Sequence, residues 1–330
     1  MNVFQNVIDY PDFNHCIFRD GFVFTSICDP ANILDAIVVR SPMQCDCWTP
    51  KKSLSNRSLD EHIAFINSHK LEKAMIIAED ISFLVKCPTL KYLEIIPADT
   101  SLKFDYSPLY EMPEIIYLSC KTLYGGSSEK YHTTVDYSKT TGVKKLQIEG
   151  KGHFNYGFLH DLDELKIYED KVNSDFQHIS QIKNLKRLWI TQSRLKSLRG
   201  LNTMWNLQEL CIDSCRTLCG IGELVHVSDS LRSFSFHNCP NVRDFSVLQY
   251  LKNLEFLHLH GNNELPNLGF LDNMPNLKVF TFSMPVKSCD LRPCLRIPYT
   301  DVSRGKRGYN LGNKDLKKIL PTTPFEIYHT

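Results

Sequence analysis

The sequence predicts an α/β solenoid, in which a curved parallel sheet lines the inner side and 3₁₀ or short helical turns line the outer side. Two observations predict this fold. The spacing apolar-x-x-apolar-x-apolar recurs through most of the chain, and its period is nearly constant in the second half. In that half each predicted strand is followed by apolar residues spaced by three, which suits a 3₁₀ turn that returns the chain to the next strand.

Residues 1–68 carry no clean repeat, so we expect them to form an N-terminal cap with a strand and a short helix. Residues 32–39 are rich in β-branched side chains and predict the strand. Ser58 stands three positions before Glu61, with apolar residues following, which is the capping-box pattern of a helix N-terminus. A cap is required because the first repeat of a solenoid would otherwise expose its apolar end face.

From residue 69 to residue 161 we expect irregular repeats. Four copies keep the apolar triplet, and their first residues are Leu71, Leu90, Ile115 and Val143. The longest step between copies contains the stretch 124–129, which is rich in Gly and Ser. This composition predicts an inserted loop that bulges from one face.

Residues 162–285 contain six regular copies, which brings residues 69–285 to about ten repeats. Each regular copy begins 22 to 24 residues after the previous one, at Leu162, Leu185, Leu207, Leu231, Leu254 and Leu277. A period this constant over six copies is hard to produce by chance. The solenoid prediction therefore depends mainly on this half of the chain.

The best-formed copy places Leu254, Leu257, Leu259 and Asn262 at the spacing L-x-x-L-x-L-x-x-N. This pattern resembles the leucine-rich repeat family. In that family the residue at position nine lies under a turn, and a buried Asn there bonds to backbone groups of neighbouring turns. The preceding regular copies carry Ser193, Cys215 and Cys239 at position nine.

The repeat length and the Asn-Leu linkers, such as Asn184-Leu185 and Asn206-Leu207, look most like the bacterial internalin and phosphatase-regulator types. This resemblance implies a bacterial, cytoplasmic protein with an adaptor or antitoxin-like immunity role. Composition by itself indicates none of this.

Residues 286–330 are expected to form a basic, proline-rich C-terminal cap, because the repeat pattern ends after Ser283. From residue 285 onward the chain holds nine Lys and Arg residues against four Asp and Glu residues. Residues 324–328 predict a last strand along the end of the sheet.

The composition is that of a folded protein. Hydrophobic residues make up 42% and charged residues 23%, which excludes a disordered chain. The formal net charge is +1, so a nucleic-acid partner is not expected from a global electrostatic attraction. No apolar run approaches the roughly 18 residues of a membrane span, and the N-terminus lacks the pattern of a secretory signal.

The chain has twelve cysteines, several of them at positions that the repeat assigns to the interior. We interpret Cys120, Cys215 and Cys239 as buried free thiols, which indicates a reducing, cytoplasmic location. Cys45 and Cys47 could supply half of a zinc site, but no second C-x-C or C-x-x-C follows.

The residues between the apolar positions should face the concave surface. Neighbouring strands lie about 4.8 Å apart, so positions three, five and seven of successive repeats should each form a ladder of adjacent side chains. We expect these ladders to bind another protein, and the predicted binding residues are Tyr168, Arg187, Trp189, Cys211, Asp213, Ser235, His237, Phe256, His258 and His260.

Two groups stand out in these ladders. Trp189 with Tyr168 and Arg187 combines the residue types that dominate binding hot spots, although Trp189 could equally pack on its ladder neighbours and bind nothing. The second group is Asp213, His237, His258 and His260 on three consecutive strands.

The Asp–His group has two interpretations. Its side chains could converge on a metal ion or form an acid–base pair, which would make the protein a metal-binding protein or an enzyme. They could also form a hydrogen-bonded polar ladder on a protein-binding surface, and this is the interpretation that we prefer. A third class of function is nucleic-acid contact by the basic segment 287–318.

No motif supports catalysis. Cys211 beside His237 lacks a third group that would orient the base, and Gly305–Gly308 does not fit a phosphate-binding loop. We therefore assign no catalytic residue, metal ligand or cofactor. The function predicted from the sequence is non-enzymatic protein recognition through the concave face.

Overall fold

The computed structural model describes residues 16–27, 34–41, 55–98, 103–122, 134–303, 308–319 and 321. The chain forms two compact units, an N-terminal unit of Gln5–Leu162 and a C-terminal unit that contains Asp163–Thr330. Several sequence predictions lie outside the described residues: Cys45 and Cys47, the stretch 124–129, most of Gly305–Gly308 and the strand at 324–328.

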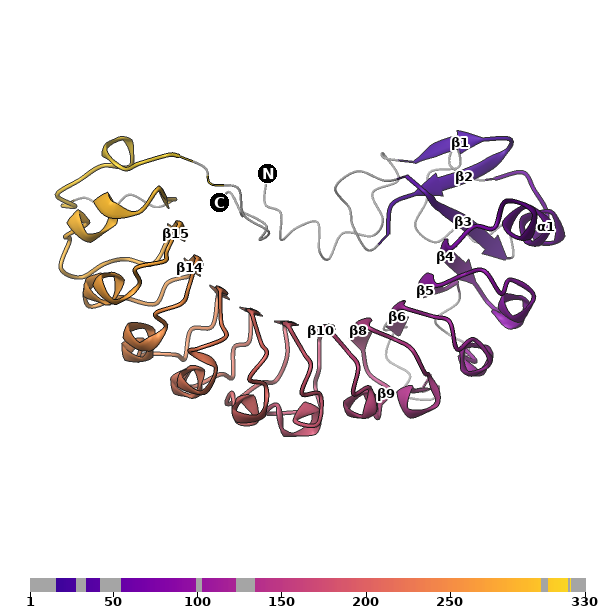
Figure 1. Ribbon diagram of the computed structural model, residues 1–330, viewed down its shortest axis with the longest axis horizontal. Helices are drawn as coiled ribbons and strands as arrows, with labels where there is room; N and C mark the ends of the chain where they lie inside the picture. Colours follow the sequence, from indigo (N-terminus) through magenta and orange to yellow (C-terminus); the bar gives the residue numbers. More distant parts are fainter. Residues whose placement is uncertain are drawn as a thin grey trace. The chain divides into compact units, whose positions relative to one another are not determined.

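The N-terminal unit begins with three strands that pair in antiparallel fashion and continues with parallel strands (Figure 1). The antiparallel strands are β1 (Ile17–Arg19), β2 (Phe22–Thr25) and β3 (Ala36–Ser41). The strands that follow β3 in parallel are β4 (Lys73–Ala78), β5 (Tyr92–Pro97), β6 (Tyr117–Thr122) and β8 (Lys145–Gly150). A separate parallel pair consists of β7 (Val135–Asp136) and β9 (His153–Phe154).

The predicted helix is present as α1 (Leu59–His69). Ser58 Oγ accepts from the backbone N–H of Glu61 at 3.2 Å, and the Glu61 carboxylate accepts from the backbone N–H of Ser58 at 2.7 Å. The helix ends at Lys70, which adopts the left-handed conformation. The capping box predicted from the sequence is therefore confirmed.

Three of the four expected irregular copies have buried apolar triplets, whereas Leu71 of the first copy is only half-buried. The apolar triplets that begin at Leu90, Ile115 and Val143 are buried, and their strands β5, β6 and β8 pair in register. β3 and β4 are also buried on the face that points away from the apolar triplets. On that face Val38, Met75 and Ile77 pack in one buried apolar cluster. Strands buried on both faces read as continuous apolar runs, as these two do.

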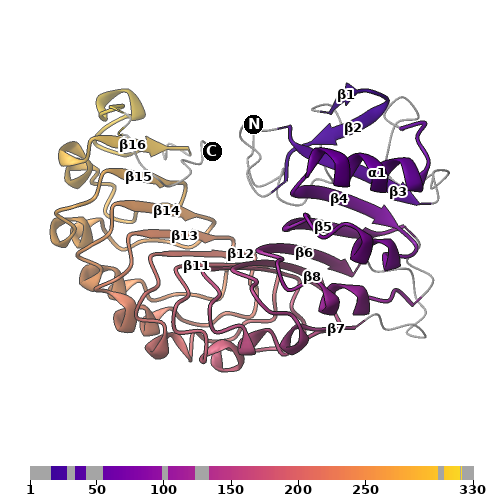
Figure 2. The same ribbon diagram turned by 45° about the vertical axis from the view of Figure 1, so that its right-hand side comes forward.

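The C-terminal unit is a parallel sheet in which each strand is followed by a short turn (Figures 1 and 2). Its strands are β10 (Glu164–Tyr168), β11 (Arg187–Thr191), β12 (Glu209–Asp213), β13 (Ser233–His237), β14 (Phe256–His260), β15 (Val279–Phe282) and β16 (Tyr299–Val302). Equivalent positions are aligned, so that Leu188 pairs with Leu210, and Leu210 with Phe234. The predicted α/β solenoid is confirmed for this unit.

Most of the returning turns are 3₁₀ helices. In the N-terminal unit they are η3 (Ser82–Lys86), η4 (Ser107–Glu111), η5 (Tyr137–Lys139) and η6 (Tyr156–Phe158). In the C-terminal unit they are η7 (Gln177–Ile179), η8 (Leu201–Thr203), η9 (Gly222–Val227), η10 (Ser246–Tyr250), η11 (Gly269–Asn273), η12 (Arg292–Arg296) and η13 (Asn313–Asp315). Figure 1 shows η7–η12 on the outer side of the C-terminal unit, which we name the turn side, and its strands on the inner side.

A repeated cap that was not among the sequence predictions starts many of these turns. An Asp or Asn side chain accepts from the backbone N–H two residues later, at 2.8 to 3.1 Å, before η3, η4, η5, η7, η10, η11 and η12. Such short polar side chains satisfy the first free N–H groups of a turn. The recurring Asp-x-Ser tripeptides, as at Asp80–Ser82 and Asp244–Ser246, were the available signal.

The repeats extend beyond residue 285, where we expected a cap to begin. β16 pairs in parallel with β15, and Leu291, Cys294 and Ile297 are buried on the turn side. The triplet was missed because its middle position is Thr300, a polar residue that is completely buried. The segment around Lys317 then pairs with the outer edge of β16, because the Lys317 carbonyl accepts from the Thr300 N–H at 2.9 Å.

The buried asparagine of the best-formed repeat is Asn263, and our assignment of Asn262 is wrong. Asn262 is exposed, whereas Asn263 is buried and its Nδ2 donates to the carbonyls of Cys239 (3.0 Å) and Val242 (2.7 Å). Gly261 adopts a φ of 145°, which makes the turn one residue longer than in preceding repeats. There the residue before position nine is left-handed, with φ values of 50°, 53° and 45° at Gln192, Ser214 and Asn238.

The thiols expected in the interior are buried and unbridged. Cys120, Cys215 and Cys239 are all completely buried and free. The Cys239 thiol contacts the carbonyl of His237 at 3.1 Å.

Candidate functional site

The inner side of the C-terminal unit presents the three predicted ladders, and we name it the strand face. Strand pairing aligns Trp189 with Cys211, Cys211 with Ser235 and Ser235 with His258 at position five. At position seven it aligns Asp213 with His237 and His237 with His260. The sheet register therefore brings the predicted site residues together as ladders.

Most of these residues are buried, which corrects our expectation that they face solvent. Only Arg187 is exposed and only His260 is half-buried. The buried residues are Tyr168, Trp189, Cys211, Asp213, Ser235, His237, Phe256 and His258. Strands about 4.8 Å apart place large side chains directly beside small ones. The large side chains of Trp189 and His258 therefore cover Cys211 and Ser235 from solvent.

One group of charged side chains on the strand face lies around Trp189. The indole N–H donates to Glu209 Oε1 at 2.9 Å, and the Lys166 ammonium lies 3.9 Å from the centre of the indole ring. Trp189 retains only 9% of its surface. It is therefore a fixed platform between neighbouring strands and not a freely exposed side chain.

Charged side chains surround this platform, and we define the tryptophan cluster as Glu164, Lys166, Arg187, Trp189 and Glu209. Glu164 contacts Lys166 Nζ at 3.4 Å and Arg187 Nε at 3.6 Å, so one carboxylate is shared between two cations. The Arg187 side chain is 44% exposed, against 13% for Glu164. Burial raises the pKa of Glu209, and the Trp189 hydrogen bond opposes this rise.

Tyr168 is not part of the tryptophan cluster. It stands at position seven of β10, aligned with Thr191, whereas Lys166 is the residue aligned with Trp189. The predicted patch of Trp189, Tyr168 and Arg187 is thus an aromatic and charged cluster that depends on Lys166 and Glu209.

Three histidines form a stack on β13 and β14, and we name it the histidine stack. The ring centres of His237 and His258 are 4.3 Å apart with an interplanar angle of 20°. His260 lies 5.6 Å from His237 and 6.1 Å from His258. His258 Nδ1 contacts Thr281 Oγ1.

The environment favours neutral imidazoles. Burial and the neighbouring His260 lower the pKa of His258 to about 3. Burial and both other histidines hold the pKa of His237 well below its ordinary value. Neutral, stacked rings form a polar ladder, which agrees with the interpretation that we preferred.

Asp213 does not complete an acid–base pair with the stack. Its Oδ1 accepts from Ser214 Oγ at 2.9 Å, and burial raises its pKa. Within the described part of the chain, no group of three or more His, Cys, Asp or Glu side chains has an arrangement that could hold a metal ion.

Cys211 is equally unsuited to nucleophilic chemistry. It is 3% exposed, and burial, with Asp213 and Glu209 nearby, raises the pKa of its thiol. A reactive cysteine requires the opposite, an electropositive and partly exposed environment.

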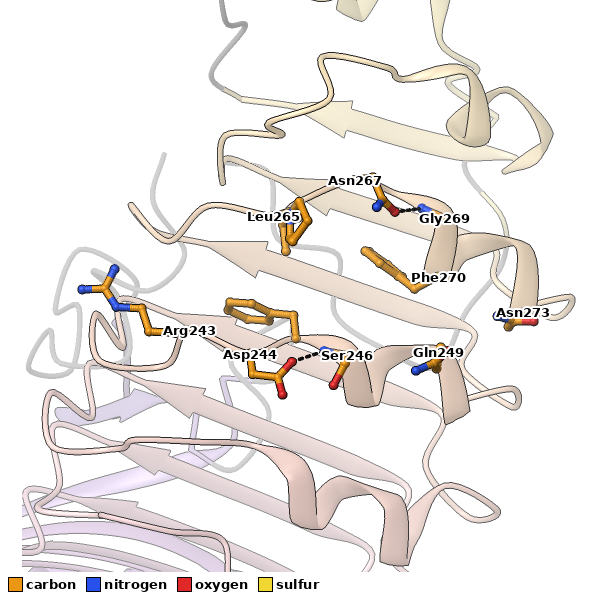
Figure 3. Close-up of a pocket in the computed structure, with 11 residues that line it drawn as sticks. Arg243, Asp244, Ser246, Gln249, Leu265, Asn267, Gly269, Phe270 and Asn273 are labelled. Carbon is orange, nitrogen blue, oxygen red and sulfur yellow. Dashed lines mark hydrogen bonds between the residues drawn. The ribbon is translucent and has the colours of Figure 1, made fainter.

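A pocket on the turn side was not anticipated from the sequence. It has a volume of about 360 Å³ and lies between η10 and η11 (Figure 3). Its lining residues are Arg243, Asp244, Phe245, Ser246, Gln249, Leu265, Pro266, Asn267, Gly269, Phe270 and Asn273.

In the described residues, no helix is both long enough and apolar enough to cross a membrane.

Comparison with known proteins gives matches to parts of larger chains. No family model matches the chain. It is 31% identical over 143 residues to leucine-rich repeat-containing protein 56 of Mus musculus, which covers 42% of this chain and 24% of that protein. It is 27% identical over 171 residues to disease resistance protein RPS4B of Arabidopsis thaliana, which covers 48% of this chain and 14% of that protein. The chain thus spans less than a quarter of either curated relative.

Among solved structures, the chain is similar to an internalin from Listeria monocytogenes. The TM-score is 0.49 and the identity 14%, over 75% of this chain and 79% of the internalin.

Proposed function

Since the chain is a leucine-rich repeat protein, we propose that it recognises another protein through the strand face of its C-terminal unit and catalyses no reaction. The leucine-rich repeat fold supports protein recognition in general, because its stacked strands provide an extended binding surface. The observation that carries the proposal is the tryptophan cluster. Arg187 stands half exposed beside an indole that its neighbours hold in place.

This arrangement has the properties of a binding hot spot. Arg and Trp dominate the energies of protein interfaces, and a side chain that is already ordered loses little entropy on binding. Two cations share Glu164, so Arg187 can pair with a carboxylate of the partner at little cost. We propose that the partner presents an acidic side chain to Arg187, which would also steer its approach.

The test is affinity capture from extracts of the source cells with the full-length chain. The variant is Arg187→Glu, and the matched control is Lys183→Glu, because Lys183 lies over the exposed Trp205 at 5.9 Å outside the strand face. We expect a partner that Lys183→Glu retains and Arg187→Glu loses at least tenfold. Retention of every captured protein by Arg187→Glu at the wild-type level would refute the proposal.

A photo-crosslinking amino acid at position 187 gives a second readout. We expect it to form a covalent adduct with the same partner, and the same amino acid at position 183 to form none. Adducts of equal yield from both positions would count against the strand face as the binding surface.

The finer role that we propose is that of an adaptor or immunity-type protein. One relative is named a disease resistance protein, although the match covers 14% of its length. The identity of the partner captured through Arg187 tests this role, since a component of a defence or toxin system is expected.

We also propose that the protein acts in the cytoplasm. The free, buried thiols Cys120, Cys215 and Cys239 support a reducing compartment. Fractionation of source cells checks this, and recovery of the chain outside the cytoplasmic fraction would contradict it.

A further inference from the structure

Two neighbouring loops of the C-terminal unit carry a concentration of positive charge. One loop, 192–200, follows β11, and the other, 214–222, follows β12. Together they contain no Asp or Glu and four basic residues, all exposed, which we name the basic patch: Arg194, Lys196, Arg199 and Arg216. The chain as a whole has a formal net charge of only +1, so this charge is local.

Hydrogen bonds hold the two loops side by side. The Cys219 N–H donates to the carbonyl of Lys196 at 3.1 Å, and Thr217 Oγ1 donates to the carbonyl of Leu195 at 2.8 Å. The loops therefore lie against each other beyond the C-terminal ends of β11 and β12. This contact brings the cations of the first loop close to Arg216 of the second.

The described part of the chain supplies no counter-charge to the basic patch. Other surface cations of the same unit are paired, as Lys186 is with Asp163 at 2.9 Å and Lys278 with Glu255 at 2.6 Å. None of the ion pairs among the described residues includes a member of the basic patch. Like charges that gather without counter-charges repel one another and lower the stability of the fold. An anionic partner would remove this repulsion.

Acidic residues limit the basic patch on both sides. The loop that follows β10 contains Glu169, Asp170 and Asp175, and the loop that follows β13 places Asp244 directly after Arg243. The positive surface is therefore confined to two loops. It suits a short segment with about as many negative charges as the patch has cations, and not a long polyanion.

The side chains of the two loops favour a protein segment over a nucleic acid. The leucine and isoleucine side chains of both loops are buried, so the basic patch has no platform on which bases could stack: Leu195, Leu198, Leu218 and Ile221. Proteins that bind duplexes contact roughly 6 to 10 phosphates, which is more than this patch can neutralise. Three of its four cations are Arg, whose planar guanidinium can pair with both oxygens of a carboxylate.

We propose that the basic patch binds an acidic segment of a protein. Arg194 and Arg216, one from each loop, would each take a carboxylate of that segment through two parallel hydrogen bonds. Arg187 begins β11, whereas the basic patch lies beyond the end of that strand. The two surfaces are therefore separate, and this proposal stands whether or not a partner is found for Arg187.

The probe is a fluorescein-labelled peptide of four Ser-Glu repeats, titrated into the full-length chain and followed by fluorescence anisotropy. Exposed ion pairs are individually weak, so we expect a dissociation constant on the order of 0.1 mM at low salt, and weaker binding as salt is raised. The ligand control is the same peptide with Gln in place of Glu, which should bind at least tenfold more weakly. Absence of binding, or equal binding of the two peptides, would overturn the proposal.

A pair of double variants locates the binding surface. Arg194→Gln combined with Arg216→Gln should weaken the acidic peptide at least fivefold, because each loop loses a cation. The matched control combines Lys183→Gln with Lys252→Gln, two exposed cations that precede β11 and β14. Both double variants change the net charge equally, so an equal loss of affinity would mean that only the net charge matters and would refute the basic patch.

Gly220 allows a test that removes no cation from the basic patch. It follows Cys219, whose N–H bonds to the Lys196 carbonyl, and no atom lies within 4 Å of a Cβ placed at Gly220. We expect Gly220→Lys to strengthen and Gly220→Glu to weaken the binding of the acidic peptide, each roughly twofold to fivefold. Equal affinities of these two variants would contradict the proposal. Their thermal unfolding midpoints are compared with that of the wild type, so that a loss of binding is separated from a loss of fold.

A nucleic-acid partner is the alternative outcome. A labelled pentathymidylate has four phosphodiester charges, as many as the peptide has carboxylates. We expect it to bind more weakly than the peptide, because its bases find no stacking platform on the basic patch. Stronger binding of the oligonucleotide would assign the basic patch to nucleic acid and overturn the proposal.

Discussion

The indole N–H of Trp189 donates to the carboxylate of Glu209, 2.9 Å away on the neighbouring strand. The bond crosses the sheet diagonally, because Trp189 is aligned with Cys211 and Glu209 stands two residues earlier on β12. It joins a nearly buried aromatic ring to a carboxylate whose pKa is raised by burial. The tryptophan cluster is thus a structural element of the sheet as well as a candidate contact.

Trp189→Phe should destabilise the protein by about 1 to 3 kcal/mol. Phe keeps an aromatic side chain, although a smaller one, and removes the N–H, so the half-buried Glu209 carboxylate loses a donor. Urea denaturation measures the change in the free energy of unfolding. Trp205→Phe is the control, since Trp205 is 57% exposed, and it should change stability by less than about 0.5 kcal/mol. Equal effects of both substitutions would contradict the role of the bond.

The stability of the Glu209→Gln variant, measured as its free energy of unfolding, should increase relative to that of the wild type as pH rises. The pKa of Glu209 in the folded protein is raised above its ordinary value of 4.5. Between pH 4.5 and the raised pKa the folded protein therefore binds more protons than the unfolded chain, and it loses stability as pH rises through this range. Gln still accepts the Trp189 N–H but does not ionise. The denaturation midpoints of Glu209→Gln and the wild type should diverge between about pH 4 and pH 8. The difference between the exposed control Glu264→Gln and the wild type should stay constant over the same range. A constant difference between Glu209→Gln and wild type would contradict this prediction.

The histidine stack should make the protein sensitive to acid. The pKa of His258 falls from 6.5 to about 3 on folding, so the unfolded chain binds more protons below pH 6.5. Stability is then full above that pH and declines toward pH 3, by about 1.4 kcal/mol per pH unit for one such group. His258→Asn should reduce this slope in denaturation experiments, and the exposed control His226→Asn should not. An unchanged slope in His258→Asn would argue against a neutral, buried imidazole.

Asn263→Ala should cost about 2 to 4 kcal/mol of unfolding free energy, because the carbonyls of Cys239 and Val242 lose their side-chain donor. Asn262→Ala should cost much less, since Asn262 is exposed. Chemical denaturation of the two variants gives the comparison directly. A larger loss for Asn262→Ala would restore the assignment made from the sequence spacing.

The regular repeats were predictable because each strand carries its own evidence. The two leucines of β14, Leu257 and Leu259, alternate with aromatic and polar residues as a strand requires, and both are completely buried, as is Leu254 before the strand. The capping box of α1 was predictable for the same local reason. By contrast, β16 was missed because Thr300 replaces an apolar residue, and only the neighbouring strand shows that this position is interior.

The ladder alignment of the candidate residues was predictable, but their environment was not. Ladder positions follow from strand period and register, so the alignment of Asp213 with His237 and His260 could be derived. Exposure could not, because it depends on the sizes of side chains on adjacent strands. His258 is completely buried although it stands at a position expected to face solvent.

The sequence by itself determined that this chain is a repeat solenoid, since the period and the apolar triplets are local properties of consecutive segments of the chain. The tertiary structure decided which histidines are neutral, which asparagine lies under the turn and where the turn side opens into a pocket. These depend on distances between residues that are some 20 positions apart in sequence and adjacent in space, such as Asn263 and Val242. Packing between neighbouring repeats sets those distances, and no single repeat contains that information.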